Sequence, residues 1–353
     1  MTRSLMSCLA ATSCLAAALL VTSPAFAQAK PKAQNVPEIP YDSVPNFLKM
    51  PPGLYMGEAI GVATNSKGHV FVYSRSGNTR LFEFDKNGNF ITEIGEGNYG
   101  FEFAHSVRVD AQDNIWVVDE GTNMVIKFNP AGRIMMVLGR RPLAMAGMLA
   151  APPGAAAPAE KYLFGRPTDV GWDKDGNIFV SDGYVNNRVV KYDKNGRFLK
   201  QVGSEKVGTG PGQFNLPHGL AVDAEGDVYV ADRGNARMQV FDNNLGFKRI
   251  SDNIGVSWTV CVSPGPHEYV FSSNSNPNGN LPGTWDNSGE IYKMERDGTV
   301  VGKFGHASKQ LGGFQVVHMF DCRNPEQIIV AEIEAWRVQK LMLKPALTTT
   351  ASK

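Results

Sequence analysis

Short apolar runs and polar turns alternate along most of the chain, and one such pattern recurs. Its clearest copies begin at Val109 (VDAQDNIWVVDEGTNMVIKFNPAGR), Trp172 (WDKDGNIFVSDGYVNNRVVKYDKNGR) and Val222 (VDAEGDVYVADRGNARMQVFDNNLG), and an earlier copy begins at Thr64. Hydrophobic and polar residues alternate with a period of two inside each run, and Asp-Gly or Asn-Gly turns separate the runs. This pattern predicts antiparallel strands joined by tight turns.

The number of copies predicts the architecture. Two degenerate copies, over 260–294 and 319–343, bring the total to six. Four-stranded units at this spacing are typical of a β-propeller, so we predict an all-β, six-bladed propeller, with seven blades as the alternative. The last copy ends after its third strand. We expect an N-terminal strand, around Phe47 to Tyr55, to supply the fourth and close the ring, which leaves no unpaired edge.

The remaining segments flank or interrupt this single domain. Residues 1–27 have a basic start, an apolar run and an Ala25-Phe26-Ala27 ending, which predicts a cleaved secretory signal peptide. We expect a flexible arm over 28–44, the propeller over 45–345 and a tail over 346–353. An Ala/Pro/Gly-rich insertion covers 142–160, and turn residues around Trp285 widen the fifth blade between Asn274 and Glu290.

Charge and hydropathy exclude several partners. Without its leader the chain has 353 − 27 = 326 residues, with 34 basic and 34 acidic side chains. This balance gives no attraction to nucleic acid or to an anionic membrane. No second apolar run approaches the roughly 18 residues that span a bilayer. We therefore expect an exported protein, periplasmic or secreted, and monomeric.

Two cysteines follow the leader, Cys261 and Cys322, on the predicted innermost strands of neighbouring blades. A disulfide requires matching geometry, which the sequence does not establish. Two buried thiols that pack as small hydrophobic side chains are the favoured interpretation.

Three of the six histidines occupy one column of the repeat. Aligning the innermost strands gives, in blade order, Ile60, His105, Thr168, His218, Trp258 and His318. Histidine thus occupies every second blade, and the three imidazoles would lie about 120° apart around one axis. Three imidazoles with an open fourth position are typical of catalytic zinc. An inherited structural histidine would more naturally fill adjacent copies or all copies. The other histidines, His69, His267 and His306, lie in turns and are expected at the surface.

A second column places positive charge beside this predicted metal site. Arg75 and Arg233 follow the second strand of blades one and four, and Tyr184 lies at the corresponding turn of blade three. Two guanidinium groups and a phenol near a metal indicate a substrate that bears a carboxylate, either a small molecule or a peptide. The structural alternatives are a salt bridge from Arg233 to Asp232 or a neighbouring blade, and a turn aromatic for Tyr184.

The segments SDGYVNNRVVKYDKNGRF, PGQFNLPHGLAVD and VADRGNARMQVFD resemble the peptidyl-α-hydroxyglycine α-amidating lyases, six-bladed propellers of the NHL-repeat type. The resemblance implies zinc ligands at His105, His218 and His318, a catalytic Tyr184 and active-site arginines Arg75 and Arg233. It implies a zinc-dependent carbon–nitrogen lyase that splits an N-acyl-α-hydroxyglycine into an amide and glyoxylate. Zinc would orient the substrate's hydroxyl group, and the Tyr184 phenolate would remove its proton.

The chain departs from the family at two positions. Met319 stands where an aspartate helps to hold a structural calcium ion, so the resemblance leaves calcium open, with backbone ligands near Val107. Val185 stands where the family has a disulfide cysteine. Two other functions compete: a calcium-dependent propeller lactonase or esterase, which needs acidic and Asn ligands at the axis, and a non-catalytic NHL propeller that binds protein or glycan.

Overall fold

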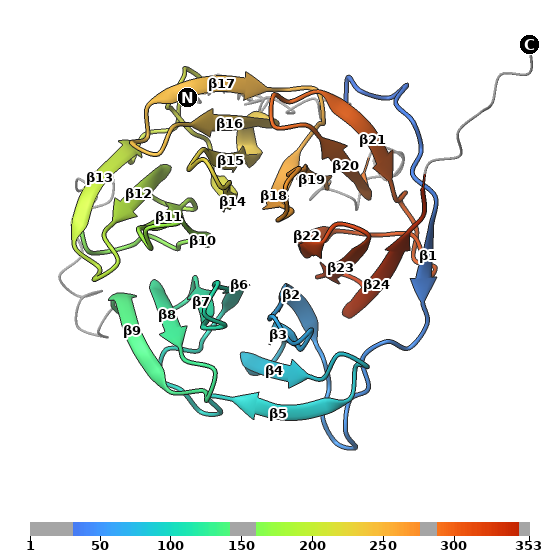
Figure 1. Ribbon diagram of the computed structural model, residues 1–353. Helices are drawn as coiled ribbons and strands as arrows, with labels where there is room; N and C mark the ends of the chain where they lie inside the picture. Colours follow the sequence, from blue (N-terminus) through green and yellow to red (C-terminus); the bar gives the residue numbers. More distant parts are fainter. Residues whose placement is uncertain (1–30, 142–159, 276–287, 346–353) are drawn as a thin grey trace, which may run out of the picture.

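Six four-stranded antiparallel sheets surround a central axis in the computed structural model, which describes residues 31–141, 160–275 and 288–345 (Figure 1). Blade 1 holds β2 (Glu58–Thr64), β3 (Val70–Arg75), β4 (Arg80–Phe84) and β5 (Phe90–Ile94). Blade 2 holds β6 (Ala104–Val109), β7 (Ile115–Asp119), β8 (Met124–Phe128) and β9 (Ile134–Gly139). Blade 3 holds β10 (Asp169–Trp172), β11 (Ile178–Asp182), β12 (Arg188–Tyr192) and β13 (Phe198–Gly203).

Blade 4 holds β14 (Pro217–Val222), β15 (Val228–Asp232), a 3-10 turn η2 (Arg233–Asn235), β16 (Arg237–Phe241) and β17 (Phe247–Ser251). Blade 5 holds β18 (Ser257–Val262), β19 (Val270–Asn274), β20 (Glu290–Met294) and β21 (Val300–Phe304). Blade 6 holds β22 (Val317–Asn324), β23 (Gln327–Glu332), β24 (Arg337–Leu343) and, as its outermost strand, β1 (Tyr41–Val44). The predicted six-bladed, all-β fold is confirmed.

The ring closes with a different segment from the one predicted. β1 pairs antiparallel with β24, with Tyr41 opposite Leu343 and Val44 opposite Lys340. The sequence prediction placed this strand around Phe47 to Tyr55 and the start of the propeller at residue 45, and both were wrong. Phe47 is instead buried against the outer strands of blade 1.

The residues before β1 lie against blades 4 and 5 instead of forming a free arm. Ala33 donates its backbone N–H to Asn253, and Ile39 donates its own to Lys303. Lys303 in turn donates to the carbonyl of Pro37. The expectation of a flexible segment over 28–44 therefore fails for its described part. The predicted leader, the tail over 346–353, Trp285 and all but the last residue of the 142–160 insertion lie outside the described residues.

Hydrophobic cores fill the spaces between neighbouring blades. One cluster joins Phe71 and Tyr73 of β3 to Val107 of β6 and Val117 of β7. Near the axis the inner strands approach so closely that two glycines are required. A Cβ at Gly61 would lie 2.6 Å from the backbone nitrogen of Val107, and one at Gly219 would lie 2.4 Å from Cα of Thr259. Within the described part of the chain, no helix is long and apolar enough to cross a membrane.

Cys261 of β18 and Cys322 of β22 form a disulfide bond between the inner strands of blades 5 and 6. The favoured sequence interpretation, two unbonded thiols, was wrong. Both residues are buried, and their Cα atoms lie 6.1 Å apart, which is a normal separation for a disulfide.

Candidate metal centre and its polar surroundings

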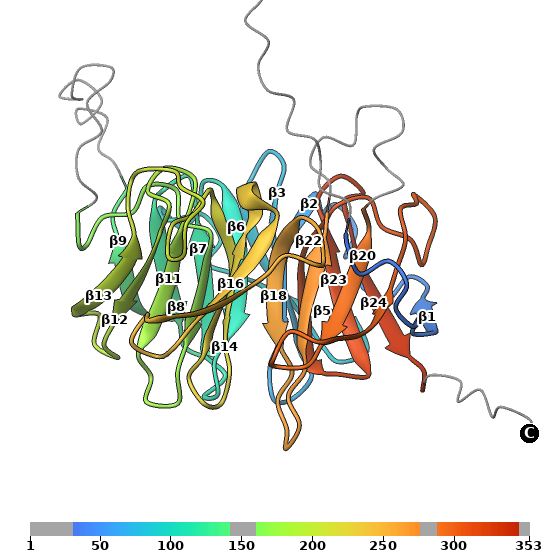
Figure 2. The same ribbon diagram turned by 90° about the horizontal axis from the view of Figure 1, so that it is seen from above.

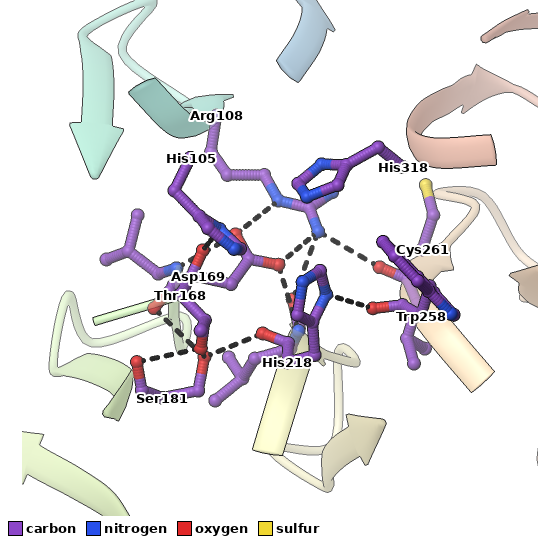
Figure 3. A network of polar contacts seen from close by, with 12 residues as sticks. His105, Arg108, Thr168, Asp169, Ser181, His218, Trp258, Cys261 and His318 are labelled. Atoms are coloured by element: carbon purple, nitrogen blue, oxygen red, sulfur yellow. Dashed lines mark hydrogen bonds and ion pairs between the residues drawn. The ribbon is translucent and has the colours of Figure 1, made fainter. Parts of the chain in front are cut away.

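The three column histidines meet at the axis and form what we call the histidine ring: His105 of β6, His218 of β14 and His318 of β22. Figure 3 shows their imidazoles pointing toward one another. The centroids are 4.6 Å apart for His105–His218, 4.8 Å for His105–His318 and 4.9 Å for His218–His318. One nitrogen from each lies within 4.8 Å of the other two, and all three residues are buried. The arrangement is close to an equilateral triangle.

The intervening blades fix the orientation of each imidazole. Nδ1 of His105 lies 2.5 Å from the carbonyl oxygen of Thr168 in blade 3. Nδ1 of His218 lies 2.7 Å from that of Trp258 in blade 5, and Nδ1 of His318 lies 2.8 Å from that of Ile60 in blade 1. A carbonyl oxygen only accepts, so each Nδ1 carries the hydrogen and each Nε2 keeps its lone pair.

The lone pairs of the histidine ring fit a metal ion. Burial lowers the pKa of all three imidazoles, that of His318 to about 3, so they stay neutral near pH 7. Nε2 of His218 is buried and has no hydrogen-bond partner in the described structure. Neutral imidazoles whose other nitrogen donates to a backbone carbonyl are ordinary zinc ligands.

Tyr184, in the turn after β11, lies against the histidine ring. Its hydroxyl oxygen is 3.3 Å from Nε2 of His105, and Arg233 donates to the same oxygen at 3.4 Å. Burial raises the pKa of Tyr184, while the positive charges of Arg233 and Arg75 oppose the increase. The protein groups alone therefore do not lower this pKa, although the resemblance implies a phenolate.

The two predicted arginines differ in how they are held. Nε of Arg75 donates to Glu58 at 2.8 Å, and its guanidinium group lies 3.7 Å from the centroid of the Phe103 ring. The guanidinium group of Arg233 lies 4.2 Å from the Trp258 ring centroid, and no carboxylate within the described ranges forms an ion pair with it. Asp232 does not hold it, because that carboxylate pairs with Arg237 at 2.7 Å. Arg233 is thus the better placed of the two to receive an anion.

Sequence reasoning missed Glu120, which follows β7 at the position that Arg75 and Arg233 occupy in their blades. Its side chain is 2% exposed, and one carboxylate oxygen, Oε2, lies 3.5 Å from Nε2 of His105. The other oxygen accepts a hydrogen bond from Arg166, whose guanidinium group lies 4.6 Å from the ring centroid of Tyr184. Burial raises the pKa of Glu120, and Arg166 opposes this. The repeat alignment places Glu120 in the same column as Arg75 and Arg233, so its position beside the histidine ring could have been predicted from the sequence.

On the side of the histidine ring away from Tyr184, Arg108 of β6 joins four blades. It pairs with Asp169 of β10 at 2.5 Å (Figure 3). It also donates to the carbonyl oxygens of Leu220 and Val260. The buried thioether of Met319 is a poor calcium ligand. Arg108 already pairs with the carboxylate and donates to the two carbonyl oxygens here. These residues do not fit a structural calcium ion.

His267 and His306 are exposed, as predicted, whereas His69 is half-buried. His69 contacts Glu83 at 2.7 Å, and His267 contacts Glu295 at 2.8 Å.

The fold and the repeat define the class of this protein. The NHL repeat model matches residues 214–241, which include His218 and Arg233. A solved gluconolactonase of Xanthomonas campestris superimposes with a TM-score of 0.57, covering 89% of this chain and 97% of that one at 15% identity, which supports the fold alone. Figure 2 shows the same ring edge-on. The chain is a six-bladed β-propeller with an NHL repeat.

Sequence comparison then identifies relatives of this chain among the curated proteins. A probable peptidyl-alpha-hydroxyglycine alpha-amidating lyase of Caenorhabditis elegans is 29% identical over 218 residues, which are 55% of this chain and 58% of the relative. NHL repeat-containing protein 3 of Mus musculus is 32% identical over 204 residues, 54% of each chain. The chain thus spans just over half the length of these two relatives, and its resemblance to the amidating lyases is confirmed.

Proposed function

We propose that this protein is an exported, zinc-dependent carbon–nitrogen lyase that cleaves an N-acyl-α-hydroxyglycine, or a carbinolamide of the same geometry, into an amide and glyoxylate. One observation carries the proposal: three neutral imidazole lone pairs converge at the axis, with the hydroxyl group of Tyr184 3.3 Å from one of them. The similarity to proteins named as lyases supports the reaction type.

The histidine ring and the arginines suit the hydroxyl group and the carboxylate of such a substrate, respectively. His105, His218 and His318 would hold the metal, which supplies Lewis-acid polarisation of the substrate's hydroxyl group. Arg233, which has an aromatic support and no carboxylate partner among the described residues, would bind the substrate carboxylate, and Arg75 would add positive charge nearby.

Tyr184 is placed to move the proton. As the phenolate, its oxygen would take the hydroxyl proton, the C–N bond would break with its electron pair going to nitrogen, and the same proton would then reach the amide nitrogen, which regenerates the phenolate. The hydroxyl carbon becomes the aldehyde of glyoxylate, so atoms and electrons balance without a redox partner. Arg233 donates to this oxygen and therefore stabilises it while it bears negative charge.

Metal content and product release test the proposal together. We expect about one zinc ion per purified chain by elemental mass spectrometry, and little in a His105→Ala/His218→Ala variant. We expect wild type to release glyoxylate from N-benzoyl-α-hydroxyglycine, and Tyr184→Phe to lose roughly 100-fold or more in kcat. A protein that stays metal-free when zinc is supplied would leave a binding propeller. Lactone hydrolysis that requires calcium would favour the lactonase alternative.

A further inference from the structure

Glu120 presents an unsatisfied carboxylate oxygen to the histidine ring. Its Oε1 accepts a hydrogen bond from Arg166, whereas its buried Oε2 has no hydrogen-bond partner in the described structure. Oε2 lies 3.5 Å from Nε2 of His105. A buried carboxylate oxygen without a donor is costly, so this orientation requires an explanation.

The facing group on His105 is also an acceptor. Nδ1 of His105 carries the imidazole hydrogen because it lies 2.5 Å from the carbonyl oxygen of Thr168. Nε2 is therefore an acceptor, and it lies 3.5 Å from Oε2 of Glu120. Two acceptors at this distance repel each other unless a cation or a hydrogen-bond donor lies next to both.

A metal ion bound by the three histidines would take up the lone pair of His105 Nε2 but would leave Oε2 of Glu120 without a partner. The three histidines, without Glu120, form the set whose ligand atoms all lie within 4.8 Å of one another. Glu120 therefore lies beside the ligand set, on the side of His105 that also faces Tyr184. A hydrogen-bond donor on a ligand bound beside the three imidazoles would satisfy this oxygen.

We propose that Glu120 accepts a hydrogen bond from the hydroxyl group of the substrate at the metal and thereby selects ligands that carry such a hydroxyl. The inference rests on the proposed function and assigns the residue that recognises the hydroxyl end of the substrate. Arg166 engages the other carboxylate oxygen and stacks on Tyr184, so it fixes both side chains in one wall of the site.

Glu120→Gln is an informative variant because Arg166 limits how the amide can turn. The guanidinium group requires an acceptor, so the amide oxygen faces Arg166 and the NH2 group faces His105. The variant thus replaces an acceptor by a donor with little change in volume. Glu102→Gln is the matched control, since Glu102 lies in the same blade region with a 49% exposed side chain and pairs with Arg141 at the surface.

The experiment compares the binding of glycolate and methoxyacetate to the zinc-loaded full chain by calorimetry. In methoxyacetate a methyl group replaces the hydroxyl hydrogen of glycolate. Zinc affinity is measured separately by chelator competition. A hydrogen bond to a charged acceptor contributes about 1.5–3 kcal/mol, so wild type should prefer glycolate by roughly 10-fold or more. In Glu120→Gln we expect this ratio to approach one. Glu102→Gln should match wild type.

Each outcome bears on the proposal. If Glu120→Gln keeps the preference for glycolate, the inference is overturned, while glyoxylate release by wild type would still support the lyase. If wild type prefers glycolate but releases no glyoxylate, the lyase reaction fails and the hydroxyl recognition stands. A wild type that binds no zinc overturns both. Should the Gln variant unfold, Glu120→Asp keeps the charge but withdraws it by one methylene, and must also lose most of the preference.

Discussion

Arg108 should be one of the largest single contributors to the stability of the ring. Its side chain pairs with Asp169, which is 2% exposed, and it donates to carbonyl oxygens in blades 4 and 5. Replacing Arg108 by Met keeps an apolar stem of similar length but removes every one of these donors. The variant therefore leaves a buried carboxylate and two carbonyl groups without the guanidinium.

The size of the loss follows from what remains around Asp169. Breaking a buried ion pair typically costs about 3–5 kcal/mol. Asp169 still accepts backbone hydrogen bonds from Val170 and Leu220, each at 2.9 Å, which reduces the penalty. We therefore expect Arg108→Met to lower the free energy of unfolding by about 3 kcal/mol, at the lower end of that range. The measurement is urea denaturation followed by circular dichroism, with and without a metal chelator.

A double-mutant cycle separates the Arg108–Asp169 interaction from a non-specific loss of stability. Asp169→Asn removes the charge that Arg108→Met would strand, so the double variant should lose at least about 1 kcal/mol less than the sum of the single losses. Arg141→Met, which breaks a surface ion pair with Glu102, should cost less than about 1 kcal/mol. A loss below about 1 kcal/mol for Arg108→Met, or strict additivity with Asp169→Asn, would refute this account of the junction.

Four further predictions follow from the described contacts. Replacing Cys261 and Cys322 by Ser removes a link across 61 residues, and the chain-entropy relation gives a loss of about 4 kcal/mol, measurable by denaturation under oxidising conditions. Calcium should not raise the melting temperature of the zinc-loaded chain, because Arg108 and Met319 leave no suitable cage; a clear increase by calorimetry would contradict this. Burial lowers the pKa of the three ring histidines, that of His318 to about 3, so the unfolded chain binds more protons at acid pH. The stability that they contribute is complete above about pH 6.5 and is lost as the pH falls below it, which pH-dependent urea curves of chelator-treated protein can check. Arg233→Gln should lower kcat/KM for a carboxylate substrate by about 10- to 100-fold and affect its methyl ester much less, whereas equal losses would place the carboxylate elsewhere.

The repeat contained enough information to predict the histidine ring. A column position in a propeller repeat becomes one depth on the inner strands, so His105, His218 and His318 could be placed together without coordinates. Glu120 shares a column with Arg75 and Arg233, but its charge is opposite to theirs, so the basic residues of the column do not predict it. A column in a ring need not have one chemistry: neighbouring blades present their side chains to different sides of the same site.

The closing strand and the disulfide depend on three-dimensional detail that the repeat does not carry. β1 has four residues and no clear alternation of its own, whereas the more apolar segment from Phe47 to Tyr55 suggested a strand. Cys261 lies three residues after its column position and Cys322 four residues after its own, so regular strands would point them to opposite faces. β22 has register irregularities between Val317 and Met319 and between Asp321 and Asn324. These irregularities change which face a residue occupies, and no spacing in the sequence reports them.

The even number of blades and the three-histidine site are one property of this ring. Each imidazole of an even blade donates to the column carbonyl of the next odd blade: His105 to Thr168, His218 to Trp258 and His318 to Ile60. Every imidazole of the histidine ring therefore has an acceptor that fixes which nitrogen keeps its lone pair. A strict alternation of imidazole and acceptor cannot close around seven blades, because two blades of the same kind would meet. Duplication or loss of one blade should thus disrupt the proposed metal centre even where the ring still closes, since at least one imidazole would lose its partner.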